Sequence, residues 1–473
     1  MPYLDLRDYL DRLEQAGKLK RITKPVEADW EISAVGRVAF RDIPESTRPA
    51  LLFENVDGSD IPVTLGILGG SRQIYGLALE VEPTPQAITT AWRKAGDSPI
   101  PPITVEEGPV KDTILKGDQA DVTVFPVPTW TVGEDPGPYL TAPYVVTKDP
   151  ETGAHNVGTY RTQVKEPRKL GVWINFVQDG RKHVEMWEER EKPTPVAIVL
   201  GSEPTLGLCS VSRVPYGVEE YAMAGGLRRE PIEIIPAETV DLMVPARAEI
   251  VIEGYFRLGE LEEEGPFGEY TGYMGPVAQS YVMDVTCITH RSKPIYQAFL
   301  SQMPPSESSM IRSIGRESAV AKNLIDNLRL PVIDVHLLEA SGAASYMAIR
   351  GRWEHEGQSR QAILGAWTVD PTLGKICVAV DEDIDIRDPF ALNWALSFRM
   401  QPDRDVFQVP GYPAVRLDPS QADESVPQLD TSRRLSTKMG VDATKKHTYP
   451  PIAFPPSDHI ERVRADWAAY WGI

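Results

Sequence analysis

The chain opens with apolar positions at helical spacing. Leu6, Tyr9, Leu10 and Leu13 recur every three or four residues among charged neighbours, and Gly17 follows them. This spacing predicts an amphipathic helix over residues 4–17 that ends at the glycine. Mixed helical and strand patterns continue to about residue 110 and predict an α/β region.

The pattern changes in the middle of the chain. Proline and glycine are frequent between residues 121 and 143, which marks an ordered loop leading into a new unit. From about 140 to 310 short β runs alternate with Gly- and Pro-containing turns, which favours an all-β or barrel-like domain. The runs lie at 144–147, 196–200, 248–256 and 281–289.

The last third alternates helical patterns with strand-like runs such as 330–336 and 375–380, which is typical of an α/β unit. Ile460, Val463, Trp467 and Trp471 stand at helical spacing and predict a closing helix over 457–471. The predicted fold class is therefore a multidomain α+β protein. We expect domains at 1–110, 111–310 and 311–473.

Composition narrows the functional classes. The chain has 473 residues and a formal net charge of −19, which argues against a nucleic-acid partner because a phosphate backbone needs a basic face. No stretch approaches the roughly 18 apolar residues that a membrane span requires. Cys209, Cys287 and Cys377 stand far apart, so we expect no zinc site built of cysteines and no disulfide framework. These features favour a reduced, cytoplasmic protein.

Two glutamates, Glu264 and Glu269, flank a Gly-Pro-Phe-Gly turn. Such a turn can aim both carboxylates into a cleft, and their pKa values can be driven apart for acid/base chemistry. A surface turn with solvated acids is the alternative. The sequence lacks GxxxxGK[ST], HExxH, GxSxG and a GxGxxG after a strand, which lowers the expectation of nucleotide hydrolysis, zinc proteolysis or dinucleotide redox chemistry.

Three other segments carry candidate polar residues. Asn156 and Arg161 lie on a predicted strand, and the arginine can hold a carboxylate by two hydrogen bonds or pair with any acid at a rim. Glu220 begins a short helix that we expect to end at Gly225 and Gly226. Lys182 and His183 stand at the head of a helical stretch, where phosphate binds well, although a lone histidine there is more often structural.

Taken together, these segments resemble the UbiD family of prenylated-FMN-dependent decarboxylases. The resemblance spans most of the chain and rests on motifs at 156–161, 220–227, 264–269, 380–385, 393–395 and 436–444. It implies a middle domain that is a split β-barrel of the flavin reductase type, holding prenylated FMN, and a C-terminal domain that mediates self-association. A homodimer is the minimum that the family suggests, and a hexamer is the other expectation.

The resemblance also implies roles for individual residues. Asn156, His183 and Glu220 correspond to the ligands of Mn²⁺ or Mg²⁺, with K⁺ nearby, and oxygen ligands with one imidazole suit such an ion better than zinc. His183 is aligned only across a gap, so Phe176, Val177 or Gln178 is the alternative position. Other expected cofactor contacts are Thr159, Tyr160, Arg161 and Lys182.

Arg161, Glu264 and Glu269 correspond to the catalytic network of the family. Glu269 is the expected proton donor after CO₂ leaves, and Arg161 pairs with Glu264 and orients cofactor and substrate. The substrate would be an aromatic, heteroaromatic or α,β-unsaturated carboxylic acid, and a flavin prenyltransferase would supply the cofactor. The alternatives are a glycoside hydrolase that uses Glu264 and Glu269, or a non-catalytic flavin- or metal-binding protein.

Overall fold

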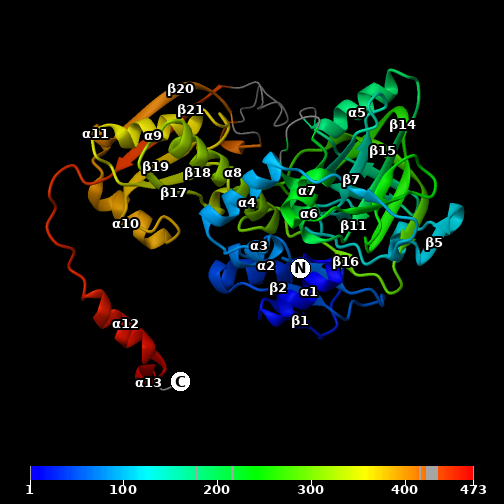
Figure 1. The fold of residues 1–473 in the computed structure, drawn as a ribbon, viewed down its shortest axis with the longest axis horizontal. Coiled ribbons are helices and arrows are strands. Elements are labelled where there is room, and N and C mark those ends of the chain that lie inside the picture. The colour runs from blue at the N-terminus through cyan, green and yellow to red at the C-terminus, as the bar shows by residue number, and fades with distance from the viewer. Residues whose placement is uncertain are drawn as a thin grey trace.

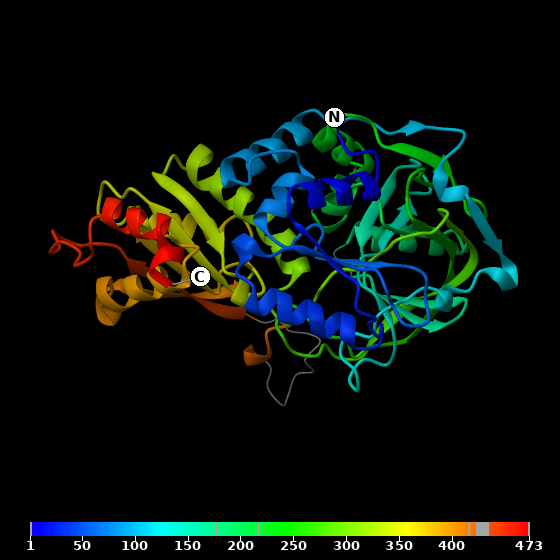
Figure 2. The same cartoon turned by 90° about the horizontal axis from the view of Figure 1, so that it is seen from below.

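The structure is a computed structural model that describes residues 2–175, 178–212, 214, 218–414, 417–421 and 435–471. The N-terminal region lies between a large central sheet and a C-terminal sheet, and the last helices reach away from the body (Figures 1 and 2). None of the helices in the described ranges is both long enough and apolar enough to cross a membrane.

The N-terminal region is a small sheet packed with helices. Its first helix is α1 (Leu6–Gln15), two residues shorter than predicted at each end. The Asp5 side chain caps its start, and Ala16 is the C-cap residue. The sheet order is β1 (Leu19–Ile22), β2 (Ala50–Phe53), β3 (Val63–Leu65) and β16 (Tyr296–Gln297). The helices are α2 (Glu31–Asp42), α3 (Arg72–Ala78) and α4 (Pro85–Asp97).

The central region is a nine-stranded sheet. Along its main path the order is β6 (Tyr139–Leu140), β9 (Thr162–Glu166), β10 (Lys169–Val172), β15 (Ala278–His290), β14 (Ile250–Glu264), β11 (Thr194–Leu200), β7 (Tyr144–Lys148) and β8 (His155–Thr159). The ninth strand, β5 (Thr113–Lys116), pairs with β15. The four predicted β runs correspond to β7, β11, β14 and β15, because their β-branched residues are buried in the sheet.

Strands near the opposite edges of this sheet must lie close together. Strands β8 and β9 are six strand-to-strand steps apart along the sheet, which is about 29 Å in a flat sheet. Yet only Tyr160 and Arg161 join them in sequence, and three Cα–Cα steps reach at most about 11 Å. The sheet therefore curls into an open half-barrel, and Arg161 lies at the seam between its ends.

Helices accompany the central sheet, so the middle of the chain is not purely β. They are α5 (Asp179–Glu188), α6 (Pro204–Val211) and α7 (Glu220–Arg228), and a small sheet of β4 (Ile103–Thr104), β12 (Glu233–Pro236) and β13 (Met243–Pro245) lies beside them. The prediction that α7 ends at its glycines is wrong. A side chain at Gly225 would lie 2.3 Å from the Ile100 carbonyl oxygen, so the glycines serve close packing inside the helix.

The C-terminal region has its own apolar cores. Its sheet order is β17 (Val332–Leu337), β18 (Tyr346–Gly351), β19 (Ile376–Asp381), β21 (Leu435–Ala443) and β20 (Val406–Pro413). Its helices are α8 (Glu307–Lys322), α9 (Gln358–Trp367), α10 (Pro389–Arg399) and α11 (Pro402–Asp405). The predicted closing helix is two helices, α12 (Ser457–Ala465) and α13 (Trp467–Trp471).

Candidate active site

Arg161 links the two predicted glutamates. Its Nε and Nη2 atoms donate to the two carboxylate oxygens of Glu264 at 3.0 and 2.8 Å, and Nη1 donates to Glu269. Burial alone would lower the pKa of Arg161, but the carboxylates of Glu269 and Glu264 outweigh it and hold the pKa above its ordinary value. The side chain therefore stays a cation between two acids.

The loop after β14 positions both glutamates. Glu264 is the last residue of β14 and only 1% exposed. Gly265 then takes a φ of +92°, which is strained for any other residue, and the loop folds back through hydrogen bonds from the Glu269 amide to the Tyr273 carbonyl and from the Gly275 amide to the Phe267 carbonyl. The buried Phe267 ring fixes the loop, with its centroid 4.3 Å from that of Tyr139.

Three residues around this network carry no motif and were not predicted. The Trp173 ring lies beneath the Arg161 guanidinium, with 4.8 Å from Cζ to the ring centroid. Tyr139 lies beside Glu264, and burial together with that carboxylate raises the pKa of Tyr139. Burial raises the pKa of Asp135 to about 6, against the lowering effect of the Thr131 and Trp130 amides. Asp135 lies in the Pro/Gly-rich segment of residues 121–143, and a charged residue in such a loop is the one signal in the sequence that points to it.

Asn156, His183 and Glu220 come together at one end of β7 and β8. Asn156 pairs with Thr147 across the two strands, and the Thr147 hydroxyl lies 3.0 Å from His183 Nδ1. The Glu220 carboxylate accepts from the Val157 amide at 2.8 Å. All three predicted ligands are buried. Arg161, by contrast, follows β8 rather than lying on it, because the strand ends at Thr159.

The electrostatics of this cluster suit a cation. Burial raises the pKa of Glu220 to about 7, and Asp179 and Glu219 add to the shift. Burial also lowers the pKa of His183, which favours the neutral imidazole that a metal requires. Within the described ranges, no three His, Cys, Asp or Glu side chains form a metal-binding group. A metal site here would therefore depend on the amide oxygen of Asn156, and the residues fit an ion of the Mn²⁺ or Mg²⁺ type.

Tyr160, Thr159 and Lys182, the other predicted cofactor contacts, each contact a different neighbour. The Tyr160 hydroxyl accepts from Asn156 Nδ2 at 3.2 Å, and its ring packs against Gly180 of α5. The Thr159 hydroxyl lies 2.8 Å from the Ser210 hydroxyl. The Lys182 ammonium pairs with Asp179 at 2.8 Å.

The sequence left three alternatives to His183. Phe176 and Val177 lie outside the described residues. The side-chain oxygen of Gln178 accepts a hydrogen bond from the Asn175 amide, just before α5.

Sequence comparisons cover almost the whole chain. Residues 10–92, 103–304 and 310–443 match the N-terminal, Rift-related and C-terminal domains of 3-octaprenyl-4-hydroxybenzoate carboxy-lyase. An uncharacterized protein of Archaeoglobus fulgidus is 34% identical over 94% of this chain and 92% of its own.

Solved structures agree with the sequence matches. The UbiD-class enzyme HmfF of Pelotomaculum thermopropionicum, in complex with FMN, is 34% identical with a TM-score of 0.86 over 97% of this chain and 99% of that one. An evolved dimeric form of HmfF in complex with prFMN is 33% identical, with a TM-score of 0.83 over 96% and 98%. The fold, the three domain matches and these structures establish that the chain belongs to the UbiD family.

Proposed function

We propose that this chain is a carboxy-lyase that removes CO₂ reversibly from an aromatic, heteroaromatic or α,β-unsaturated carboxylic acid with prenylated FMN as cofactor. The observation that carries the proposal is the position of Arg161 between Glu264 and Glu269 at the seam of the half-barrel. Relatives of one third identity bind FMN and prFMN, which supports a flavin in this chain.

The residues divide the work as follows. Arg161 binds the substrate carboxylate, because its guanidinium is the cation of the network. When that carboxylate takes the Nη1 position, Glu269 loses its ion pair and its affinity for a proton rises. Glu264 keeps its two hydrogen bonds and holds Arg161 in place.

The reaction breaks the bond between the carboxyl carbon and its neighbour. CO₂ leaves without the bonding electron pair, which remains on the neighbouring carbon, and Glu269 delivers a proton to that carbon. The bound cofactor would supply the electron sink that makes this separation accessible. Carboxylation is the reverse sequence, with Glu269 removing the proton.

Asn156, His183 and Glu220 would hold Mn²⁺ or Mg²⁺, which would neutralise the cofactor phosphate, with K⁺ nearby. Thr159, Tyr160 and Lys182 lie next to this cluster in sequence and would complete the phosphate end. The residues 1–110, 111–310 and 311–473 would act as an N-terminal domain, a split-barrel cofactor domain and a C-terminal self-association domain. The partners would be the acid, CO₂, a flavin prenyltransferase and further copies of the chain in a homodimer or hexamer.

The test is Glu269→Gln in protein produced together with a flavin prenyltransferase. We expect decarboxylation of a panel of acids to collapse while the flavin content is unchanged. Glu262→Gln is the matched control, since Glu262 lies near the end of β14, just before the loop that carries Glu269, but pairs with Lys165 and Lys169 at the surface. Unchanged turnover in Glu269→Gln would remove the proton-donor role. Hydrolysis of a glycoside without bound flavin would instead support the carboxylate-pair hydrolase.

A further inference from the structure

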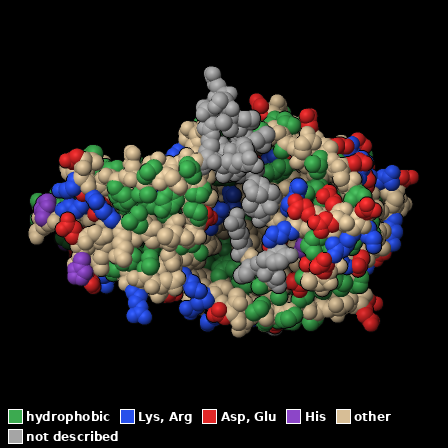
Figure 3. Space-filling model, turned by 90° about the horizontal axis from the view of Figure 1, so that it is seen from above, with side chains coloured by type: hydrophobic (Ala, Val, Ile, Leu, Met, Phe, Trp, Pro, Cys, Tyr) green, Lys and Arg blue, Asp and Glu red, His purple; other side chains and the backbone are tan. Residues whose placement is uncertain are grey.

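The loop that carries Glu269, residues 265–275, lies between the central and C-terminal regions. A side chain at Gly342 of the C-terminal region would lie 2.4 Å from the Tyr270 carbonyl oxygen, yet the Tyr273 side chain is 63% exposed. On the face shown in Figure 3 the molecule is hollowed between these two regions. Packing around the loop is therefore incomplete, and its contacts with the rest of the chain decide how firmly Glu269 is held.

Two side chains of the segment just before α8 lie where glycines of this loop have none. A side chain at Gly268 would lie 2.6 Å from Cδ of Gln302, and one at Gly272 would lie 2.5 Å from Sδ of Met303. Gly268 directly precedes Glu269 in the sequence. The Gln302 amide therefore lies against the backbone that carries the Glu269 carboxylate, in space that a larger residue than glycine would occupy.

Gln302 has an uncommon backbone conformation. Its φ is +74°, in the region that favours glycine, although its side chain is only 7% exposed. Its Oε1 accepts from the Thr131 hydroxyl at 3.1 Å, whereas Nε2 has no hydrogen-bond partner among the described residues. A buried donor without a partner destabilises the fold. The contact with Gly268, rather than hydrogen bonding, therefore explains the position of this side chain.

Arg37 of α2 holds the strained segment in place. Its Nη2 donates to the Ser301 carbonyl at 2.7 Å. Its Nη1 donates to the carbonyl of Pro305, at 3.0 Å, and to that of Met303. These bonds fix the backbone on both sides of Gln302, which is the support that a positive φ requires in a residue other than glycine.

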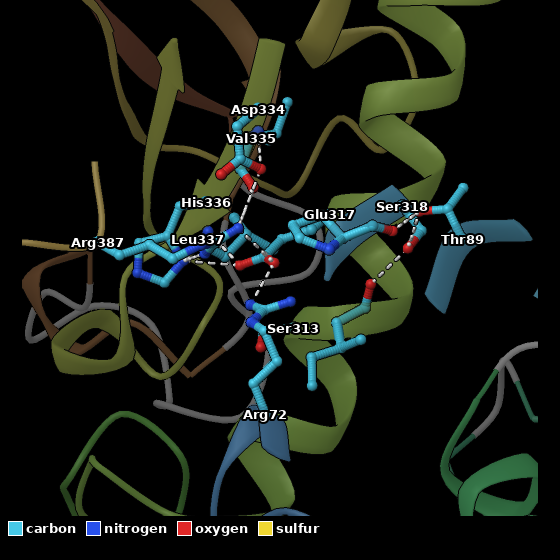
Figure 4. Close-up of polar contacts among 12 residues, drawn as sticks. Arg72, Thr89, Ser313, Glu317, Ser318, Asp334, Val335, His336, Leu337 and Arg387 are labelled. Atoms are coloured by element: carbon cyan, nitrogen blue, oxygen red, sulfur yellow. Dashed lines mark hydrogen bonds and ion pairs between the residues drawn. The ribbon is translucent and has the colours of Figure 1, made fainter. Parts of the chain in front are cut away.

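Helix α8, which follows the segment directly, is itself fixed at two points. The Glu307 carboxylate at its start accepts from the Gly66 amide at 2.7 Å. Near its other end Glu317 pairs with Arg72 at 2.9 Å and with Arg387 at 3.6 Å (Figure 4). The segment is thus held between α2 and an anchored helix, and it can pass that rigidity to the loop.

We propose that Gln302 is a positioning residue for Glu269. Its side chain fixes Gly268 and so keeps the Glu269 carboxylate at the place from which it delivers a proton. This inference rests on the proposed function and adds a residue that acts through Glu269. Arg161, which binds the substrate carboxylate, is held by Glu264. Loss of the Gln302 side chain should therefore slow protonation without weakening substrate binding.

The test compares Gln302→Gly with Glu191→Gly in protein loaded with prenylated FMN. Both substitutions remove a larger residue from a positive φ, of +74° and +54°, but Glu191 is exposed just after α5. We expect Gln302→Gly to lower kcat about tenfold or more and to leave KM within about twofold, because only the proton donor is misplaced. The solvent deuterium isotope effect on kcat should rise as protonation becomes slower. Glu191→Gly should change none of these values.

Gln302→Met is the conservative variant, because it keeps a side chain of similar length against Gly268. Its kcat should lie within about threefold of the wild-type value. Thermal melting shows whether each variant folds. A kcat in Gln302→Met as low as that in Gln302→Gly would overturn the inference, because the contact with Gly268 would then not be what positions Glu269.

Hydrogen exchange in residues 265–275 of FMN-loaded protein needs no turnover. The amides of Glu269, Gly272 and Gly275 are hydrogen-bonded inside the loop, and they should exchange faster in Gln302→Gly than in the wild type or in Glu191→Gly. Unchanged exchange, or unchanged kcat, in Gln302→Gly would overturn the inference. Failure of the wild-type protein to decarboxylate any acid would instead remove the proposed function, and faster exchange would then still show that Gln302 fixes the loop.

Discussion

Arg161 donates two parallel hydrogen bonds, of 3.0 and 2.8 Å, to the carboxylate of Glu264, although the two residues are 103 positions apart in the sequence. A lysine in place of the arginine cannot reproduce this planar, two-pronged contact. We therefore expect Arg161→Lys to lower kcat/KM by about 100-fold or more, because the substrate carboxylate and both glutamates lose their fixed cation. Steady-state kinetics on the loaded protein measures the effect.

Arg257 offers a matched control for that substitution. It makes the same two-pronged contact with Asp284, at 2.9 Å for both bonds, but at the protein surface. Arg257→Lys should change the free energy of unfolding by less than about 1 kcal/mol and leave kcat/KM unchanged. A similar loss of turnover in both variants would contradict a special role for Arg161.

Glu220 should control metal retention. Glu220→Gln keeps the size of the side chain and removes the buried charge that a divalent ion would neutralise. We expect its manganese content after gel filtration to fall to less than about a tenth of the wild-type value, with a parallel loss of flavin. Glu219→Gln, one residue earlier and bonded to the His155 amide, is the control that should keep its metal. Equal manganese in both variants would exclude Glu220 as a ligand.

Glu307 should make stability fall as the pH rises. Burial raises the pKa of Glu307 to about 7 from its ordinary 4.5, so the folded chain holds the proton more tightly than the unfolded chain. The contribution is complete below about pH 4.5 and is lost as the pH rises towards 7. Its upper limit is about 3 kcal/mol. Urea unfolding should therefore show that Glu307→Gln costs more at pH 5 than at pH 7.5.

Glu317→Gln, on the same helix, provides the opposite case. The folded-state pKa of Glu317 lies well below its usual range, so its stabilising contribution is present above about pH 4.5 and is lost only on acidification. Its cost should fall between pH 5 and pH 3, the opposite direction to that of Glu307→Gln. If the loss of unfolding free energy changed with pH in the same direction in both variants, the pKa values of Glu307 and Glu317 would not be shifted in opposite directions.

The C-terminal arm, residues 449–471, should determine assembly. It reaches away from the body in Figure 1, and Ile452, Phe454, Trp467 and Tyr470 are exposed along it. Apolar side chains gathered on such an arm normally mark an interaction surface. We expect deletion of residues 449–473 to lower the number of subunits per particle, measured by light scattering, while the fold of the remaining chain is kept. An unchanged number of subunits would show that assembly does not use the arm.

Local patterns predicted the elements better than their boundaries. The four β runs of the middle region were recognisable because continuous β-branched residues are buried on both faces of the sheet. The end of α7 was misplaced because glycine is usually a helix terminator, whereas here Gly225 and Gly226 allow close packing against Ile100 and Ala95. That contact is tertiary and leaves no local signal.

The candidate site was predictable to the extent that it consists of motifs. Arg161 contacts both Glu264 and Glu269. Asn156 and His183 both neighbour Thr147, and Glu220 contacts Val157, but the roles of all six residues stay predictions. Trp173 belongs to no motif, and its position beneath Arg161 follows from strand order. The seam itself depends on which strands pair, and pairing is not encoded in any single segment.

The two-residue connection between β8 and β9 has two roles in this chain. One connection of two residues both completes the curvature of the sheet and delivers the guanidinium on which the proposed chemistry depends. Partial unfolding that lets the sheet flatten would pull Arg161 away from Glu264 before most helices had lost their hydrogen bonds. Activity therefore depends on the curvature of the sheet. In mild denaturant, activity should be lost before the helical circular-dichroism signal.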